Sequence, residues 1–107
     1  MKSIIEGRRY DTEAPRTRLI GETTGGSPYT TDFSHWSAGL YVTGKGSYFL
    51  AGKGGPMTAF SKRCSDSTWT GGEKVIPLTS EDAYKWAEEN LKPEQLESEF
   101  PELIQEA

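Results

Sequence analysis

The stretch that most constrains the fold runs from residue 40 to residue 50, Leu-Tyr-Val-Thr-Gly-Lys-Gly-Ser-Tyr-Phe-Leu. Two runs of aromatic and β-branched residues flank a Gly-Lys-Gly centre, and this pattern predicts a β-hairpin. A three-residue loop over residues 44–46 gathers apolar side chains on one face: Leu40, Val42, Tyr48 and Leu50. A two-residue loop at Gly44 and Lys45 shifts the register by one residue and reverses the strand faces. We favour the three-residue loop because it separates apolar from polar side chains better, but the sequence alone leaves both registers open.

Further strands are predicted on both sides of this hairpin. They are expected at residues 3–6, 16–23 and 73–78, where runs of apolar and β-branched residues are bounded by turn residues. Pro77 suits an edge strand or the end of a strand, because proline cannot donate a ladder hydrogen bond. The glycine-rich segment from Gly52 to Pro56 is expected to be an irregular connection, and a helical turn is expected around residues 58–63.

The clearest helix start lies at Thr79, where Thr-Ser-Glu-Asp matches a capping pattern. In that pattern the Thr79 hydroxyl accepts a hydrogen bond from the backbone N–H of Asp82. Apolar residues then follow at helical spacing: Ala83, Trp86, Ala87 and Leu91. The helix is expected to end between Asn90 and Pro93, and Pro93 suits the first position of a second helix. Pro101 is expected to begin a third short turn.

These elements predict an α+β fold, a small antiparallel sheet of four to five short strands with the C-terminal helix packed on one face. One domain spans residues 1–107, with strands and loops over 1–78 and an acidic helical segment over 79–107. A chain of this length buries roughly 65% of its unfolded surface, which is enough for one hydrophobic core.

Charge is distributed unevenly along the chain. Residues 1–80 hold ten Lys or Arg and seven Asp or Glu, whereas residues 81–107 hold two Lys and nine Asp or Glu. Carboxylates spaced along a helical surface can present a field like that of a phosphate backbone to a basic partner. The candidate partner-binding residues are these carboxylates and two aromatic anchors: Glu81, Glu88, Glu89, Glu94, Glu97, Glu99, Tyr48 and Trp69. An ordinary solvated acidic helix explains the same charges, and this alternative stays open.

The N-terminal part of the chain suggests a second kind of binding. Its basic residues are Arg8, Arg9, Arg16, Arg18, Lys53, Lys62 and Arg63, and they lie among Tyr10, Tyr48, Phe49 and Trp69. Such interleaving is typical of surfaces that bind single-stranded nucleic acid, with cations on phosphates and rings on bases. The net charge of −4 weighs against it, because nucleic-acid-binding domains are usually basic. Solvated strand faces are the simpler explanation.

Catalytic and metal-binding patterns are weak. His35 is the only histidine and Cys64 the only cysteine, and neither is accompanied by the partners that a general base, a nucleophile or a zinc site requires. The glycines of 52–56 do not have phosphate-loop spacing. We therefore expect a non-enzymatic protein without cofactor or metal. The absence of a signal peptide, of an internal disulfide and of a long apolar run predicts a cytoplasmic protein with no membrane contact. We also expect a monomer.

Three motifs resemble a family of small, mostly uncharacterised proteins of bacterial phages and conjugative elements. The first is Ile-x-Gly-x-x-Tyr-Asp-Thr over residues 5–12. The second, over residues 40–57, is Leu-Tyr-x-Thr-x-x-Gly-x-Tyr-Phe-Leu-x-Gly-x-Gly-Gly-Pro-Met. The third, over residues 71–89, is Gly-Gly-Glu-Lys-x-Ile-Pro-Leu-Thr-x-Glu-x-Ala-x-x-Trp-Ala-Glu-Glu. The departures lie in the insert from Thr24 to Tyr29 and in the tail after Pro93.

The resemblance implies an accessory protein of a mobile element, and small proteins of that origin are often inhibitors of host defence, including anti-CRISPR proteins. The sequence thus favours an inhibitor that binds a basic surface of a host defence protein or ribonucleoprotein complex, such as CRISPR–Cas. It would occlude nucleic-acid or partner binding without contacting nucleic acid itself. The competing hypothesis is a small nucleic-acid-binding or regulatory module that uses the basic N-terminal half.

Overall fold

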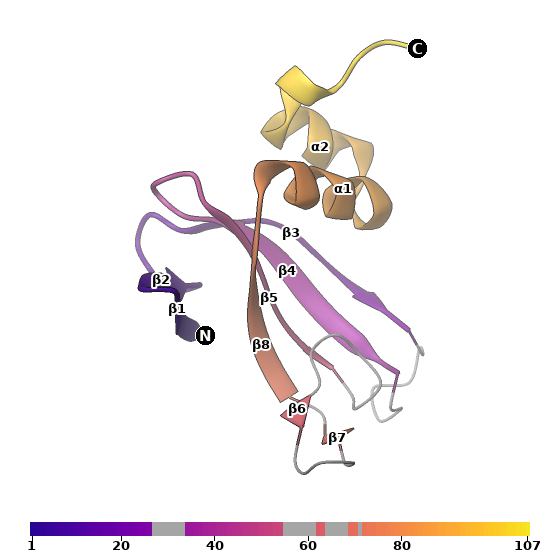
Figure 1. The fold of residues 1–107 in the computed structure, drawn as a ribbon. Coiled ribbons are helices and arrows are strands. Elements are labelled where there is room, and N and C mark those ends of the chain that lie inside the picture. The colour runs from indigo at the N-terminus through magenta and orange to yellow at the C-terminus, as the bar shows by residue number, and fades with distance from the viewer. Residues whose placement is uncertain (27–33, 55–61, 64–68, 71) are drawn as a thin grey trace.

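The computed structural model describes residues 1–26, 34–54, 62–63, 69–70 and 72–107. Its centre is a four-stranded antiparallel sheet with the strand order β3-β4-β5-β8 (Figure 1). The four strands are β3 (Arg18–Gly25), β4 (Trp36–Val42), β5 (Tyr48–Gly54) and β8 (Gly72–Leu78). The predicted α+β fold with a small antiparallel sheet is confirmed.

The central hairpin, formed by β4 and β5, has the predicted three-residue loop. Leu40 pairs with Leu50 across the two strands. At the tip, the Thr43 N–H donates to the Ser47 carbonyl at 2.9 Å, and the Gly46 N–H donates to the Thr43 carbonyl at 2.9 Å. Gly46 has a φ of 84°, a left-handed conformation that glycine adopts without the steric cost of a Cβ. The three-residue loop sets the register of the hairpin, and the register determines which side chains reach each face of the sheet.

The irregular connection predicted after the hairpin is wrong for Gly52–Gly54. These residues continue β5, and Gly52 pairs with Ala38 of β4 and with Lys74 of β8. Pairing on both sides supplies the ladder hydrogen bonds and outweighs the low strand propensity of glycine, which depends strongly on such context. Gly55 and Pro56 lie outside the described residues.

The helical turn predicted around residues 58–63 is wrong at its C-terminal end. Lys62–Arg63 form the short strand β6, which pairs antiparallel with β7 (Trp69–Thr70). Pairing with β7 therefore decides the local structure of Lys62 and Arg63. Residues 58–61 lie outside the described part of the chain.

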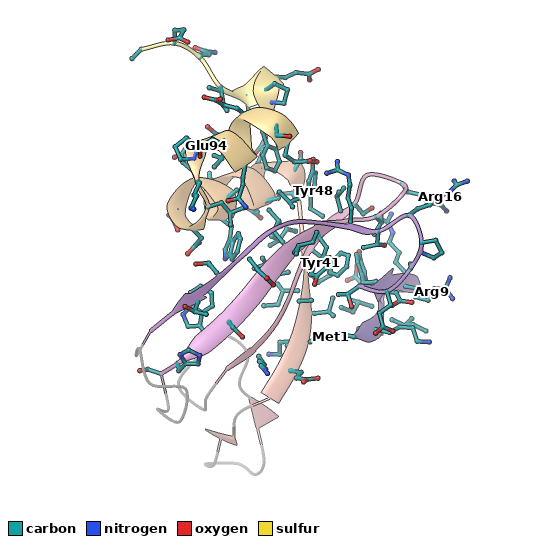
Figure 2. The ribbon with its side chains drawn as sticks, turned by 180° about the vertical axis from the view of Figure 1, so that it is seen from behind. Met1, Arg9, Arg16, Tyr41, Tyr48 and Glu94 are labelled. Atoms are coloured by element: carbon teal, nitrogen blue, oxygen red, sulfur yellow. The ribbon has the colours of Figure 1, made fainter. Side chains whose placement is uncertain are left out.

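One face of the central sheet is covered by a two-stranded hairpin of β1 (Lys2–Ile5) and β2 (Arg8–Asp11). It buries a cluster that we call the hairpin core: Tyr10, Phe49, Ala51 and Val75. The Tyr10 and Phe49 rings meet edge to face at 5.4 Å, and Tyr41 stacks on Phe49 at 5.4 Å. In Figure 2 this hairpin lies on the right, below the label of Arg16. The sequence predicted β1 but not that β1 and β2 form a separate cover for the sheet.

The opposite face is covered by α1 (Ser80–Asn90) and α2 (Pro93–Glu99), followed by the 3-10 turn η1 (Pro101–Leu103). The Thr79 hydroxyl accepts from the Asp82 N–H at 3.1 Å, as the capping pattern predicts. Pro93 occupies the first turn of α2, also as predicted. None of the helices in the described ranges is long and apolar enough to cross a membrane.

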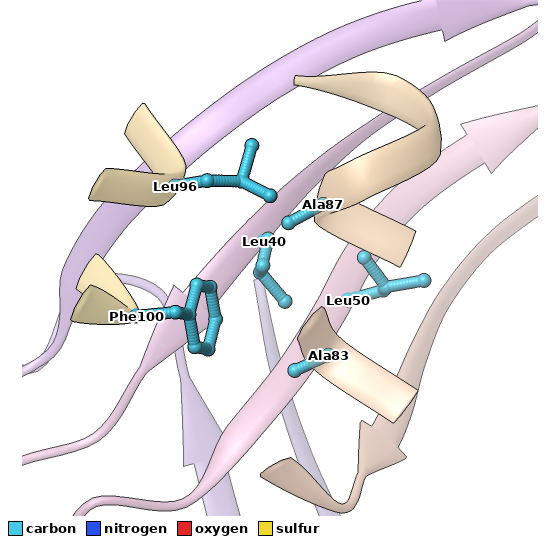
Figure 3. Close-up of a cluster of buried hydrophobic side chains, with 6 residues drawn as sticks. All are labelled: Leu40, Leu50, Ala83, Ala87, Leu96 and Phe100. Carbon is cyan, nitrogen blue, oxygen red and sulfur yellow. The ribbon is translucent and has the colours of Figure 1, made fainter. Parts of the chain in front are cut away.

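The helices and the sheet enclose a cluster that we call the helical core: Leu40, Leu50, Ala83, Ala87, Leu96 and Phe100 (Figure 3). The small side chains of Ala83 and Ala87 let α1 lie close to the sheet beside Leu40, which is fully buried. Trp86 and Leu91 are half-buried against this cluster, so the apolar stripe predicted for α1 faces the sheet. The opposite side of α1 is therefore left to solvent.

Candidate functional site

Five of the predicted carboxylates are exposed on α1 and α2, and we call this set the acidic helical face: Glu81, Glu88, Glu89, Glu94 and Glu97. All five are exposed because the apolar stripe of α1 and Leu96 of α2 turn toward the sheet. Lys85, also exposed, lies one helical turn from both Glu81 and Glu89 and offsets part of their charge. The acidic helical face is thus a negatively charged layer at one end of the molecule.

Glu99 differs from these five carboxylates. It accepts two hydrogen bonds from the Arg18 guanidinium, from Nη1 to Oε2 at 2.6 Å and from Nη2 to Oε1 at 2.9 Å. The Glu99 side chain is only 10% exposed, whereas that of Arg18 is 62% exposed. This two-point contact joins α2 to β3, so the charge of Glu99 is compensated within the protein.

Tyr48, one of the two predicted aromatic anchors, lies at the junction of the sheet and α2. Its ring is half-buried against Phe100, with the centroids 5.4 Å apart. Burial raises the pKa of the Tyr48 hydroxyl, and the nearby charge of Glu99 raises it further. The ring is thus engaged in holding the helices to the sheet. The second anchor, Trp69, lies in β7, and its side chain is outside the described part of the structure.

A cleft of about 700 Å³ lies on the other side of the molecule, and we call it the basic cleft. Three chain segments line it, namely the β1–β2 hairpin from Gly7, the turn at residues 14–17, and the tip of the central hairpin at residues 43–47. Their basic residues are Arg8, Arg9, Arg16 and Lys45. Figure 2 shows Arg9 and Arg16 on this side of the molecule, away from Glu94 on the helical layer.

Strand geometry separates the two arginines of β2. Arg8 pairs with Ile5, and Ile5 packs against the hairpin core, so the Arg8 side chain is on the face of β2 that turns toward the sheet. Arg9 pairs with Ile4, which is 71% exposed, so the Arg9 side chain is on the outer face. Arg9 therefore lies at the rim of the cleft. The cleft also contains one carboxylate, Asp11, whose Oδ1 accepts from the Glu13 N–H at 2.9 Å.

Arg16 is positioned by the tip of the central hairpin. A Cβ added to Gly44 would lie 2.6 Å from the Arg16 Cβ and 3.0 Å from its Cδ. Real carbon atoms do not approach so closely, so the arginine stem packs on Gly44 in a way that no larger residue permits. Glycine at position 44 thus brings Arg16 and Lys45 to the same cleft.

The structure separates the aromatic residues of the nucleic-acid hypothesis from its basic residues. Tyr10 and Phe49 belong to the hairpin core, with Phe49 fully buried, so stacking of bases on these rings is wrong. Arg18 is paired with Glu99, and Lys53 is exposed on β5 outside the cleft. The side chains of Lys62 and Arg63 lie outside the described residues.

The sequence missed Lys45 as a site residue. The signal was present, because a lysine between two glycines at a hairpin tip is exposed by the turn itself. Its proximity to Arg8 and Arg16 depends on how the β1–β2 hairpin docks, which no local pattern encodes.

The described residues contain no group of three or more His, Cys, Asp or Glu side chains placed to hold a metal ion. His35 is half-buried directly before β4, and Cys64 lies outside the described ranges. Comparisons of the chain with family models, curated proteins and solved structures find no match. The resemblance to proteins of phages and conjugative elements therefore stays a prediction.

Proposed function

We propose that the protein is a non-enzymatic inhibitor whose acidic helical face occupies a basic surface of a bacterial defence complex, with CRISPR–Cas as the specific target. The observation that carries this proposal is the grouping of five exposed carboxylates on two helices that contact each other. Their inward sides pack in the helical core, and the sides that carry these carboxylates are exposed.

The proposed mechanism is electrostatic attraction followed by steric occlusion. Carboxylates on a rigid surface raise the rate of encounter with a basic groove, and like charges repel competing nucleic acid from the same groove. The pairing of Glu99 with Arg18 supports this role indirectly, because it fixes α2, which presents Glu94 and Glu97, to the edge strand β3. The mobile-element resemblance supplies the choice of a host defence complex in the bacterial cytoplasm as the partner.

The decisive experiment compares two charge-reversal variants with the same net charge. The first reverses four residues of the acidic helical face: E88K, E89K, E94K and E97K. The second reverses four exposed carboxylates elsewhere: E6K, E13K, E22K and E73K. Each protein is produced in bacteria that carry an active CRISPR–Cas system, and survival of a targeted plasmid is measured across a panel of system types.

We expect the unaltered protein and the second variant to protect the plasmid in at least one system, and the first variant to give no protection. Far-ultraviolet circular dichroism checks that both variants remain folded. Protection by the first variant would exclude the acidic helical face from the mechanism. Failure of the unaltered protein in every system would reject the CRISPR–Cas target.

A further inference from the structure

We propose that the basic cleft is a second binding site, which takes the phosphate backbone of a single-stranded nucleic acid without recognising its bases. This site uses none of the residues of the acidic helical face. The two proposals can therefore fail independently.

Cations from three separate chain segments converge on the same cleft of about 700 Å³. They are Arg8 from β2, with Arg9 at the rim, Arg16 from the turn before β3, and Lys45 from the hairpin tip. Such convergence raises the free energy of the folded protein when no ligand is bound, because like charges repel one another. Three cations held around one concave site do lower the free energy of a bound polyanion.

The charges of Arg8, Arg16 and Lys45 are not compensated by nearby carboxylates in the described part of the chain. Among the described residues, none of Arg8, Arg16 and Lys45 has an ion-pair partner, in contrast to Arg18, which is held by Glu99. Asp11 is the one carboxylate in the lining, and it accepts a backbone hydrogen bond from Glu13. The cleft is therefore positively charged in a protein whose net charge is −4.

The net negative charge of the protein does not prevent a polyanion from binding here, because salt limits the distance over which each exposed charge acts. At physiological ionic strength the Debye length is about 8 Å, so exposed charges farther away contribute little. The carboxylates of α1 and α2 are on the helices that cover the helical core on one face of the sheet, whereas β1 and β2 cover the hairpin core on the other. A polyanion at the cleft is thus shielded from most of the acidic residues by the sheet and by solvent.

The kind of cation in the cleft favours a phosphate ligand. Arginine presents a planar fork of N–H donors that matches two phosphate oxygens at once, and three of the four basic residues in the lining are arginines. The rings nearest the cleft offer no stacking surface, because Tyr10 is buried against Phe49. Contacts limited to phosphates give affinity but little sequence discrimination. We therefore expect binding that is independent of base identity and sensitive to salt.

The test measures fluorescence anisotropy of labelled oligothymidylate and oligoadenylate with the full chain over a range of salt concentrations. One variant removes the three cations inside the rim of the cleft and keeps Arg9 at the rim: R8Q, R16Q and K45Q. A control variant makes the same change in net charge at three exposed lysines outside the cleft: K53Q, K74Q and K85Q. Three phosphate contacts to a single strand give a slope of log affinity against log salt of about −2.

We expect the unaltered protein and the control variant to bind both oligonucleotides with this slope. The cleft variant should bind at least about tenfold more weakly with a slope near zero, because few counterions are released. Equal weakening of the two triple variants would overturn the proposal, since it would reflect net charge alone. So would the absence of binding by the unaltered protein, or a strong preference for one base.

A pair of glycine variants tests the cleft without removing any charge. Gly44→Ala should weaken oligonucleotide binding several-fold, because the new Cβ displaces the Arg16 stem. Gly46→Ala should leave the affinity unchanged in protein that remains folded, because a Cβ there meets no atom within 4 Å and the cost lies in its positive φ. Equal affinity of the two variants would show that Arg16 does not contribute from this position.

Competition identifies the chemical class of the ligand. We expect inorganic tripolyphosphate to displace the oligonucleotide and polyglutamate of the same charge to displace it poorly, because the arginine forks favour phosphate. Displacement by polyglutamate at equal concentration would favour an acidic peptide and overturn the assignment. Binding of tripolyphosphate without any binding of oligonucleotide would reject the nucleic acid as the source of the phosphates.

Discussion

The two faces of the central sheet are covered by different kinds of structure. On one face, two helices press small side chains such as Ala83 and Ala87 against Leu40. On the other face, a two-stranded hairpin brings the single large ring of Tyr10 onto Phe49. α1 fully buries only Ala83 and Ala87, and its exposed side carries carboxylates. The two-stranded hairpin covers only part of its face, and the basic cleft opens beside it.

This difference shows how one short strand can support two surfaces of opposite charge. Phe49 and Leu50 are neighbours in β5, yet they lie in the hairpin core and the helical core respectively. Because successive residues of a strand point to opposite faces, both covers are anchored on the same strand. The acidic helical face and the basic cleft are therefore held in fixed relation to each other, and a change in either core should affect both.

The largest expected effect is a loss of stability when a buried side chain of either core is truncated. This change also tests whether the two cores form one cooperative unit. Phe49→Ala should lower the free energy of unfolding by about 3–5 kcal/mol and Leu40→Ala by about 2–5 kcal/mol, because both side chains are fully buried. Urea unfolding followed by circular dichroism and by tryptophan fluorescence should show a single transition for each variant. Ile4→Ala, at a position that is 71% exposed, is the control and should change stability by less than about 0.5 kcal/mol. Two separate transitions would mean that the faces fold independently.

A smaller effect is expected where the helical cover meets the edge strand. A double-mutant cycle with Arg18→Gln and Glu99→Gln should give a coupling energy of about 0.5–1 kcal/mol, because the contact has good two-point geometry but Arg18 is largely exposed. The coupling should fall as salt is added. The same variants should leave oligonucleotide affinity nearly unchanged, since Arg18 is outside the basic cleft. A coupling energy of zero at low salt would show that the contact of Arg18 with Glu99 does not help to hold α2 on β3.

The smallest expected effect compares one tyrosine on each face at high pH. Burial raises the pKa of Tyr48, with a further contribution from Glu99, and burial raises the pKa of Tyr41, with a contribution from Glu22. In the unfolded chain these two tyrosines ionise near pH 10, at a lower pH than in the folded protein. Their contribution to stability is therefore fully present below about pH 10. It is lost as the pH rises through the raised pKa values of the folded state.

Spectrophotometric titration of tyrosine ionisation measures this difference. Glu99→Gln should move the Tyr48 component toward lower pH and leave the Tyr41 component in place. Tyr48→Phe should reduce the alkaline loss of stability, measured by urea unfolding between about pH 9 and pH 11. An unchanged titration curve in Glu99→Gln would show that the carboxylate does not act on Tyr48.

The helical cover was predictable because its signals are local. Thr79 is three residues before Asp82, Pro93 stands at a helix start, and the apolar residues of α1 repeat at helical spacing. The hairpin loop was predictable for the same reason, since one glycine in a left-handed conformation, Gly46, closes it. Each of these features depends on a few consecutive residues, and sequence patterns report such features well.

The end of β5 and the basic cleft were not predictable, because their structure depends on contacts between segments that are not neighbours in the sequence. Gly52–Gly54 has low strand propensity and is held in β5 by pairing with two neighbouring strands. The cleft exists only because the β1–β2 hairpin docks on Phe49 and places Arg8 near the tip of another hairpin. The approach of Arg16 to Gly44 likewise joins residues that no common motif connects. The acidic residues could thus be selected from the sequence, whereas the basic cleft could be recognised only in three dimensions.

The central hairpin has a consequence for how the protein opens in solution. β4 and β5 are each paired on two sides, and both of their faces are covered over part of their length. Amide hydrogens of Leu40 and Leu50 should therefore be the last to be replaced by deuterium, at a rate set by global unfolding. Those of β1 and β2, which pair only with each other, should be replaced sooner. The basic cleft would then loosen before the rest of the protein does.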